Sequence, residues 1–329
     1  MIRISRSILA TCILSIASAL SGPASAQAVN DFPSRAITII VPFPPGGSSD
    51  RVVRLIARQL QENTGQSVIV DNRPGGNGFI GIQALRRAAP DGHTVFMGHA
   101  ATHSINPAMM NELPYDPIKD FAPITTFMSF PSVLMVPADS PDQSVADLLA
   151  RARDTQGGLT YSSQGIGTAG HILGAMLESA TGPWFLHVPM PGAAGAVTEV
   201  VAGRVDMIFS SYITAGGFVK DGRLRMLAIA SPQRSEALPD LPTMEEAGVA
   251  GVDQDYWFGF FAPAETPEPI VRRLNEEFVK AIRSPDVQGM LTSQAANVLT
   301  ATPEEFAQLI EADIERMQTL VKTAGLKNE

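Results

Sequence analysis

The feature that most constrains the fold is an apolar run, residues 37–41, that passes through a glycine pair into a helix-forming stretch. Gly46 and Gly47 carry no side chains, and Asp50 stands where the first turn of a helix is expected. Such a strand-to-helix junction directs unpaired backbone N–H groups and the positive end of a helix dipole into one small space. The junction therefore predicts an anion site on an α/β fold.

Three further glycine-rich turns follow expected strands in the same way. They lie at residues 73–78, 165–170 and 189–195. A single turn of this kind is most often only a tight turn that needs positive φ. Several such turns, each bare of bulky side chains and each between a strand and a helix, are typical of ligand clefts in open α/β sheets.

Short β-branched runs alternate with amphipathic stretches along most of the chain, which favours α/β layers. The expected strands are 36–42, 67–71, 94–98, 133–137, 159–162, 185–188, 206–209 and 226–230. The expected helices include 50–63, 78–89, 145–155, 168–180, 194–202, 269–283 and 303–323. The last helix has Thr302 as its expected N-cap, Pro303 at its first position and Glu305 three residues after the cap. The sequence shows no internal repeat.

The first 26 residues have the layout of a cleavable export signal. Arg3 and Arg6 supply a basic start, residues 8–20 are apolar, and residues 24–26 form a small-residue cleavage site. The apolar run is shorter than the roughly 20 residues that a membrane span needs. Cys12 raises the alternative of a lipid-anchored precursor, but the apolar run continues beyond it, which disfavours a cut there. We therefore expect a periplasmic mature protein.

Charge and cysteine content exclude several functions. The formal net charge is −9, and cleavage of the signal removes two arginines. An acidic chain disfavours nucleic acid and anionic membranes as partners. The only cysteine leaves with the signal, so the mature chain has no disulfide, thiol nucleophile or cysteine metal ligand. Because the overall field repels an anion, an anion site here needs local donors.

Two chain crossings predict two lobes. Residues 121–126 and 130–137 are expected to be consecutive extended segments separated by Pro131, where the chain passes from one lobe to the other. The aromatic run 256–263 is expected to return it. These crossings assign residues 27–126 and 256–329 to a discontinuous first lobe, and residues 127–255 to a second lobe.

The turn at residues 165–170 also matches the G-x-G-x-x-G pattern of dinucleotide sites, since it follows an expected strand and opens an expected helix. In such a site the next strand ends in an acidic residue that meets the ribose. Here that strand ends at His187, Val188 and Pro189. The pattern therefore predicts a second anion-ready helix start rather than a nucleotide cofactor.

The histidines and serines form no recognisable reactive site. His99 and His103 are four residues apart, but no third ligand stands at a recognisable metal spacing. The sequence has no G-x-S-x-G elbow, P-loop or S-x-x-K motif. We therefore expect a binding protein without a metal, a cofactor or an enzymatic activity.

At these motifs the sequence resembles the Bug family, the TctC-type periplasmic receptors of tripartite tricarboxylate transporters. The resemblance covers essentially the whole mature chain. The matching motifs are residues 33–43 with 46–50, 70–76, 90–94, 161–163 with 165–168, 203–207 and 241–248.

The resemblance implies an α/β, two-lobed Venus flytrap of type II that holds a small organic carboxylate in the cleft between the lobes. It also implies a monomeric receptor that presents this ligand to the inner-membrane subunits of a tripartite tricarboxylate transporter. The residues that the resemblance places at the ligand are Phe43, Pro44, Gly46, Gly47, Ser49, Asp50, Thr102 and Asn106 in the first lobe, and Ser162, Gly165, Gly167, Thr168, Pro191, Gly192 and Ala193 in the second.

One position departs from the family pattern. Relatives often have Tyr-Lys-Gly or Tyr-Arg-Gly after the strand that ends at Pro189, whereas this chain has Met190, Pro191 and Gly192. The loss of a basic and an aromatic side chain favours a less charged or more apolar ligand.

The expected function is the capture of a small organic anion for uptake. Two alternatives stay open at this point: an exported hydrolase or lyase that uses the same cleft, and a sensory module that reports ligand occupancy to a membrane signalling protein. Turnover that is lost when a cleft serine or histidine is changed would favour the first alternative. Co-purification with a membrane kinase would favour the second.

Overall fold

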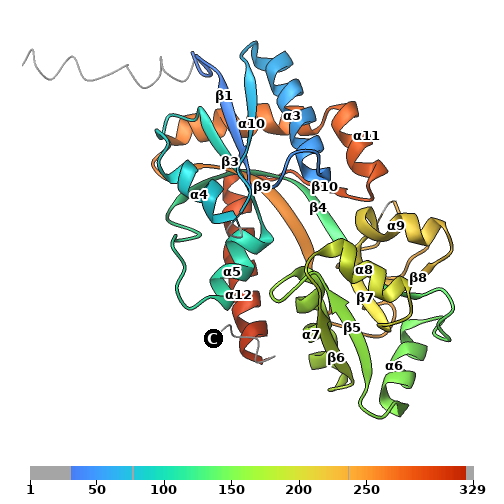
Figure 1. Cartoon of the computed structure of the whole chain (residues 1–329). Coiled ribbons are helices and arrows are strands. Elements are labelled where there is room, and N and C mark those ends of the chain that lie inside the picture. The colour runs from blue at the N-terminus through green and yellow to red at the C-terminus, as the bar shows by residue number, and fades with distance from the viewer. Residues whose placement is uncertain (1–30, 76–77, 236, 324–329) are drawn as a thin grey trace, which may run out of the picture.

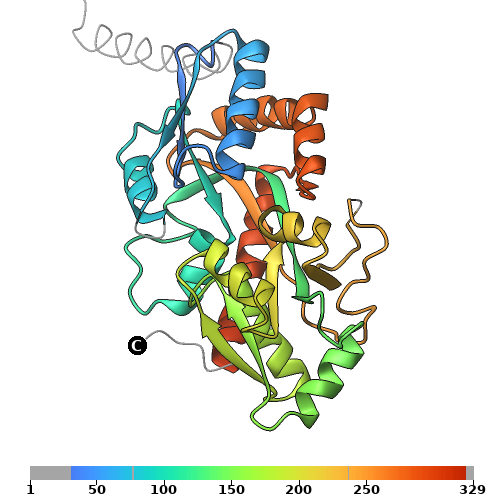
Figure 2. The same ribbon diagram turned by 45° about the vertical axis from the view of Figure 1, so that its right-hand side comes forward.

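The computed structural model describes residues 31–75, 78–235 and 237–323. The chain forms two β-sheets covered by helices, and one long strand, residues 121–137, pairs in both sheets (Figures 1 and 2). We call the part built on the first sheet lobe 1 and the part built on the second sheet lobe 2. The expected export signal, with Cys12, lies outside the described residues.

The sheet of lobe 1 has the strand order β2-β1-β3-β9-β4. Its strands are β1 (Ile37–Val41), β2 (Val68–Asn72), β3 (Thr94–His99), β9 (Asp255–Pro263), β4 (Phe121–Pro137) and the short β10 (Asn297–Val298), which pairs with β4. Strand β1 is parallel to β2 and β3, whereas β9 is antiparallel to both of its neighbours. The helices of this lobe are α3 (Ser48–Thr64), α4 (Phe79–Arg86), α5 (Asn106–Met109), α10 (Glu268–Ile282) and α11 (Pro285–Ser293), with a π-helical turn η2 (Ala101–Ile105) before α5.

The sheet of lobe 2 has the strand order β6-β5-β7-β4-β8. Its own strands are β5 (Leu159–Ser163), β6 (Phe185–Pro189), β7 (Met207–Ser211) and β8 (Leu224–Ala230). Its helices are α6 (Val145–Asp154), α7 (Ala169–Thr181), α8 (Ala193–Val201) and α9 (Tyr212–Lys220). Strand β5 is parallel to β6 and β7, and β4 is antiparallel to β7 and β8.

The two sheets therefore have the same topology, although the sequence shows no repeat. In each sheet the second, first and third parallel strands lie side by side in that order. An antiparallel strand that arrives from the other lobe comes next, and a fourth strand of the lobe follows it. In lobe 1 the incoming strand is β9, and in lobe 2 it is β4. This equivalence makes the turn after β1 and the turn after β5 structural counterparts.

Strand β4 is one continuous strand of 17 residues rather than the two segments that the sequence suggested. It pairs with β9 as far as Pro131, which lies opposite Asp255, and from Ser132 onward it pairs with β7 and β8. A proline lacks the N–H that a sheet ladder needs, and here it falls where the strand exchanges one set of partners for the other. The limits of the lobes at residues 126 and 256 stay a prediction.

Helix α3 shows how the sequence pattern produces an element of lobe 1. Val52, Val53, Ile56 and Leu60 recur at helical spacing and are fully buried against the sheet. The helix ends at Gly65, which adopts left-handed geometry with φ of 70° and donates its N–H to the Gln61 carbonyl. Burial of this stripe fixes the start of α3 beside the end of β1.

The C-terminal helix α12 (Pro303–Thr323) contacts both lobes. Phe306 and Ile310 pack in a core cluster with strands of lobe 1, whereas Met317 and Val321 join the core of lobe 2. Figures 1 and 2 show the helix running beside the crossing strands. Its predicted cap is confirmed, since the Glu305 N–H donates to the Thr302 hydroxyl and the Thr302 N–H to the Glu305 carboxylate. Among the described residues, no helix is both long and apolar enough to cross a bilayer.

Candidate functional site

The candidate site is formed by the turns at the carboxyl ends of the parallel strands. In both sheets the strand order reverses beside the first strand, and ligands of open α/β sheets bind at that switch point. In lobe 1 the turns after β1 and β3 flank it. In lobe 2 the turns after β5 and β7 flank it, with the turn after β6 nearby. The predicted site residues follow β1 and β3 in lobe 1 and β5 and β6 in lobe 2, except Ser162, which lies within β5.

The turn after β1 is held by Asp50, the third residue of α3. Its carboxylate accepts the Gly46 N–H at 2.8 Å, the Arg54 side chain at 2.9 Å and the Asn72 amide at 2.8 Å. The Asn72 amide also donates to the Phe43 carbonyl. Burial raises the pKa of Asp50, but the hydrogen bonds from Arg54, Gly46 and Asn72 outweigh it and lower the pKa overall. Asp50 is only 1% exposed, so its role in this structure is to hold the turn.

The other predicted residues of this turn surround the start of α3. Pro44, Gly46 and Gly47 are exposed, while Ser49 is buried. Phe43 is half-buried, and its ring lies 5.1 Å from that of His99 at the end of β3. Gly47 is the N-cap residue of α3 and has no side chain that could cap it. The first N–H groups of this helix therefore begin at an exposed surface.

The turn after β3 is a π-helical segment in which Thr102 is fully bonded, whereas the buried His103 Nε2 and Ser104 hydroxyl have no hydrogen-bond partner among the described residues. The buried Thr102 hydroxyl accepts the His99 N–H, donates to the His99 carbonyl and contacts the His103 ring nitrogen at 2.8 Å. This chain of bonds places the proton of the neutral His103 ring on Nδ1. The His103 ring stacks on Phe261 at 4.0 Å, in an apolar box where burial lowers its pKa. Thr102 therefore stabilises the turn through its bonds to the main chain of His99. Asn106, which follows the π-helical segment, is half-buried.

The turn after β5 is held entirely by neutral groups. The Thr168 hydroxyl donates to the Gly165 carbonyl at 2.7 Å, and the Gly165 N–H donates to the Ser163 hydroxyl at 3.1 Å. The Gly167 N–H donates to the His171 ring at 3.1 Å. Gly165 and Gly167 both adopt positive φ, of 126° and 77°, where a side chain is strained. These bonds leave the N–H groups of the first turn of α7 without an intrahelical partner.

The remaining turns of lobe 2 complete its edge. Ser162 is fully buried and donates its hydroxyl hydrogen to the Ala196 carbonyl, which ties α8 to β5. Pro191 and Gly192 are exposed before α8, and Ala193 is half-buried. After β7, the hydroxyls of Ser211 and Thr214 lie 3.0 Å apart at the start of α9. This last turn was not among the predicted site residues, although the serine pair Ser210 and Ser211 after an expected strand is a signal of the same kind as Ser48 and Ser49.

Four helices that begin at this edge, α3, α7, α8 and α9, have no side-chain cap from a described residue. Their N-cap residues are Gly47, Thr168, Gly192 and Ser211. Helices α4 and α10 share this property. By contrast, Ser144 caps α6 and Ser284 caps α11, both away from these turns. Uncapped N–H groups are available to an anion, and a capped start is not.

The turns of lobe 2 are uncharged, whereas the turn after β1 has one exposed cation, Arg51, that forms no ion pair with a described residue. The sequence has no Lys, Arg, Asp or Glu at residues 164–169, 190–194 or 210–214. In lobe 1 the charge of Asp50 is paired with Arg54, and Arg73 pairs with Asp71 at 2.7 Å. Among the described residues, no group of three acidic, histidine or cysteine side chains is placed to hold a metal.

The structure brings the two lobes into contact beside these turns. A Cβ atom added at Gly167 would lie 3.1 Å from the Met109 sulfur of α5, so the turn after β5 abuts lobe 1. Ile213, at the start of α9, packs against the core of lobe 1.

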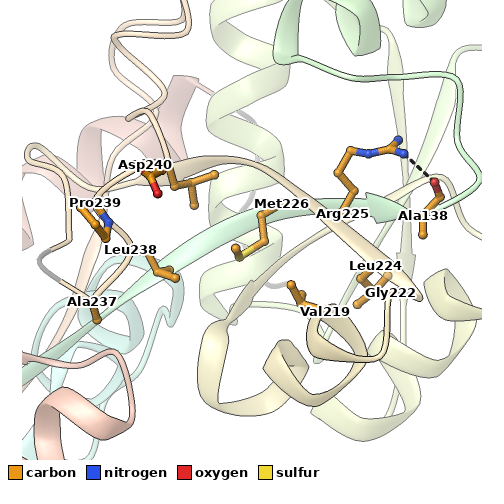
Figure 3. A pocket seen from close by; sticks show the side chains of 11 residues that line it. Ala138, Val219, Gly222, Leu224, Arg225, Met226, Ala237, Leu238, Pro239 and Asp240 are labelled. Carbon is orange, nitrogen blue, oxygen red and sulfur yellow. Dashed lines mark hydrogen bonds between the residues drawn. The ribbon is translucent and has the colours of Figure 1, made fainter.

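Two cavities of about 700 Å³ lie elsewhere, and neither is lined by a predicted site residue. One is in lobe 2 between β8, α9 and the segment 237–241 (Figure 3), and its Arg225 is occupied by the Ala138, Ser140 and Asp142 carbonyls. The other is in lobe 1, between residues 107–120 and α12.

This arrangement defines a class of protein: two α/β lobes of matching topology, joined by two crossing strands, form the fold of periplasmic solute-binding proteins. The family model of the tripartite tricarboxylate transporter family receptor matches residues 52–326. The chain belongs to that family, whose members, Bug proteins among them, are periplasmic binding proteins.

Similar proteins agree with this assignment. A UPF0065 protein from the tcbD-tcbE intergenic region of Pseudomonas sp. (strain P51) is 40% identical over 90% of this chain and 88% of its own. Protein BugT of Bordetella pertussis is 31% identical over 96% of this chain and 97% of its own.

Solved structures of similar proteins include two with ligands. An R. palustris protein solved with adipate is 33% identical, with a TM-score of 0.79 over 90% of this chain and 99% of its own. The protein MatC from Rhodopseudomonas palustris, solved with bound malate, is 32% identical, with a TM-score of 0.73 over 88% of this chain and 100% of its own. Two other similar structures are the periplasmic binding protein BugD, 29% identical with a TM-score of 0.75, and a TctC solute binding protein from Polaromonas, 28% identical with a TM-score of 0.77.

Proposed function

We propose that this protein captures a small organic carboxylate between its two lobes in the periplasm and presents it to the membrane subunits of a tripartite tricarboxylate transporter. The observation that carries the proposal is the set of uncapped helix starts, α3 in lobe 1 and α7, α8 and α9 in lobe 2. They lie at the carboxyl ends of the parallel strands of a receptor fold. The ligands of two similar structures, adipate and malate, are carboxylates and support it.

In this proposal the backbone N–H groups bind the ligand. The ligand carboxylate accepts hydrogen bonds from the first N–H groups of α3 and of the lobe 2 helices. Gly46, Gly47, Gly165, Gly167 and Gly192 leave room for its approach. Asp50 is paired with Arg54, and Asp71 with Arg73, so the N–H groups and helix dipoles, with the exposed Arg51 beside them, carry the electrostatic recognition.

Helix dipoles alone are too weak for tight capture. One helix terminus contributes roughly 0.3–1 kcal/mol, and up to ~2 kcal/mol when partly buried. Micromolar affinity corresponds to about 8 kcal/mol. Closure of the lobes must therefore exclude water from the hydrogen bonds and bury the body of the ligand. Phe43 and Ile166, which is 63% exposed at the tip of its turn, offer apolar surface for that body.

Two substitutions at one position test the role of the helix start. Gly47 has φ of −66°, which any residue adopts, and a Cβ atom there would lie an ordinary 3.8 Å from the Pro44 carbonyl. Gly47→Ser adds a neutral oxygen that caps the N–H groups of α3, whereas Gly47→Ala adds bulk without an acceptor.

We expect wild-type protein to bind adipate or malate in calorimetry, with compaction seen by small-angle scattering. Gly47→Ser should bind about tenfold more weakly than Gly47→Ala while its resistance to urea is unchanged or higher. Failure of a broad panel of mono-, di- and tricarboxylates to bind would overturn the proposal. Equal affinity of the two variants would remove α3 from the site.

A further inference from the structure

His171 occupies an unusual position beneath the turn after β5. It is the third residue of α7, and its Nδ1 accepts the N–H of Gly167, the residue just before the N-cap Thr168. A carboxylate from Glu commonly reaches back in this way at a helix start. Here an imidazole does so. Because Nδ1 accepts a hydrogen bond, the proton of the neutral ring lies on Nε2.

A second imidazole lies directly against the first. The rings of His171 and His187 stack with centroids 4.2 Å apart and planes 14° apart, and His187 stacks in turn on Tyr161 at 4.8 Å. The His187 Nε2 lies 2.7 Å from the Ser163 hydroxyl, which accepts the Gly165 N–H. Both glycines of the turn are thus connected to this histidine pair.

The surroundings of the pair keep both rings neutral. Burial lowers the pKa of His171. Burial, together with the charge that His171 would carry, lowers the pKa of His187 to about 4. The positive end of the α7 dipole also disfavours a cation at the third position of the helix. Two stacked rings cannot both be charged without strong repulsion, so the pair takes up its first proton as a unit.

From these contacts we propose that His171 is a positioning residue whose neutral ring holds the Gly165–Thr168 turn in its ligand-binding shape, and that protonation of this ring in acid weakens ligand binding. The inference rests on the proposed function. A protonated Nδ1 carries a hydrogen that faces the Gly167 N–H, so two donors oppose each other. The Gly167 bond is then lost, and the N–H groups of the turn move away from the ligand.

Other titratable groups near the pair act differently. Tyr161, from β5, keeps its proton because burial raises its pKa. Glu178, farther along α7, interacts electrostatically with Tyr161, and burial raises its pKa. Ser163, from β5, contacts His187, and Met109, from α5, lies beside Gly167. Neither side chain is an acid or base. Glu178 therefore needs its own control.

The decisive experiment compares the pH dependence of binding in matched variants. In His171→Asn the side-chain oxygen stands near the position of Nδ1 and accepts the Gly167 N–H without titrating. Adipate and malate are the probes, and the ratio of the two proteins' dissociation constants cancels the protonation of the probe itself. His93→Asn removes a buried imidazole from lobe 1, and Glu178→Gln removes the nearby carboxyl group.

We expect equal affinities for wild type and His171→Asn at pH 7.5. Below the pKa of His171, wild-type affinity should fall about tenfold per pH unit relative to the variant, as one-proton linkage requires. His93→Asn and Glu178→Gln should follow the wild type. A ratio between wild type and His171→Asn that stays constant through the pH range in which NMR shows the His171 ring to become protonated would overturn the inference.

A ligand-free measurement separates this inference from the proposed function. The amide resonance of Gly167 in apo protein should shift with pH in step with the ring carbons of His171, and should not titrate in His171→Asn. If that shift occurs but no carboxylate binds, the proposed function fails and the positioning role stands. If the resonance does not follow His171, the positioning role fails whatever the protein binds.

Discussion

The turns after β1 and β5 are counterparts in the two lobes, and they use the same bond with different chemistry. In each, the third residue of the following helix accepts the N–H of the residue before the N-cap. Asp50 accepts the Gly46 N–H in lobe 1, and His171 accepts the Gly167 N–H in lobe 2. Both pairs are four residues apart. Lobe 1 uses an anion with its own cation, Arg54, and lobe 2 uses a neutral ring.

The difference shows how a side-chain acceptor can hold the turn of an anion site without repelling the anion. A carboxylate close to a bound anion weakens its binding unless a cation compensates the charge. In lobe 1, Arg54 and Asn72 hold the Asp50 carboxylate. The three turns of lobe 2 have no charged residue that could do the same, so an uncharged acceptor gives the same geometry without repulsion.

The largest expected effect is on the stability of lobe 1. Asp50→Ala removes a buried acceptor from Gly46, Arg54 and Asn72, which we expect to lower the free energy of unfolding by about 2 kcal/mol in urea at pH 7. Because the hydrogen bonds lower the pKa of Asp50, its contribution is full above the unfolded pKa of about 3.9 and is lost as pH falls through the folded pKa. The difference between Asp50→Ala and wild type should therefore shrink toward pH 2.

The exposed pair of Glu199 with Arg204 supplies the control for this measurement. Glu199→Ala should change stability far less than Asp50→Ala, since ion pairs at the surface contribute little. If Asp50→Ala lowered the free energy of unfolding no more than Glu199→Ala does, the Asp50 hydrogen bonds would not hold the turn.

Replacing the neutral acceptor of lobe 2 by the acidic acceptor of lobe 1 should have the second-largest effect, and that effect should be on ligand affinity rather than on folding. His171→Asp copies the lobe 1 arrangement into lobe 2 without a compensating cation. We expect its stability to stay within about 0.5 kcal/mol of wild type, because an acidic group suits a helix start. Carboxylate affinity should fall about tenfold in calorimetry at low salt. Gln156→Asp adds the same charge at an exposed position, and an equal loss there would assign the effect to net charge alone.

The smallest expected effect concerns the contact between the lobes. Gly167→Ala strains a left-handed residue and crowds Met109, whereas Gly157, with φ of 88°, has open space around it. We expect Gly167→Ala to cost about 0.5–1 kcal/mol more than Gly157→Ala in urea unfolding. In a Met109→Ala background this excess should disappear, because the crowding atom is gone. If the additional cost of Gly167→Ala persisted in the Met109→Ala background, the turn after β5 would not pack against α5.

The sequence predicted much of the fold because the decisive signals were local. The family and fold class are confirmed, and the expected strand 36–42 is observed as β1. The continuous β4 was missed because Pro131 normally interrupts a ladder, and only the exchange of partners at that residue makes it tolerable. The π-helical turn η2 follows from the packing of His103 among aromatic rings, which no local pattern reveals.

Within the candidate site, the sequence located the turns better than it assigned their side chains. Thr102 and Ser162 were predicted to line the site, yet both are buried with their hydroxyls bonded to the main chain. Ligand contact by the predicted residues, Thr102 and Ser162 included, stays a prediction. The four-residue spacings from Gly46 to Asp50 and from Gly167 to His171 were visible in the sequence, but their shared meaning required the matching sheet topology.

The exchange of crossing strands also governs how the molecule can fold. Neither sheet is complete until β4 has paired in one lobe and β9 has returned to the other, and α12 then packs against both. A fragment cut at either crossing would lack an interior strand of its own sheet. The neighbouring strands would then expose unpaired backbone N–H and C=O groups. We therefore expect the two lobes to fold as one cooperative unit rather than as separable modules.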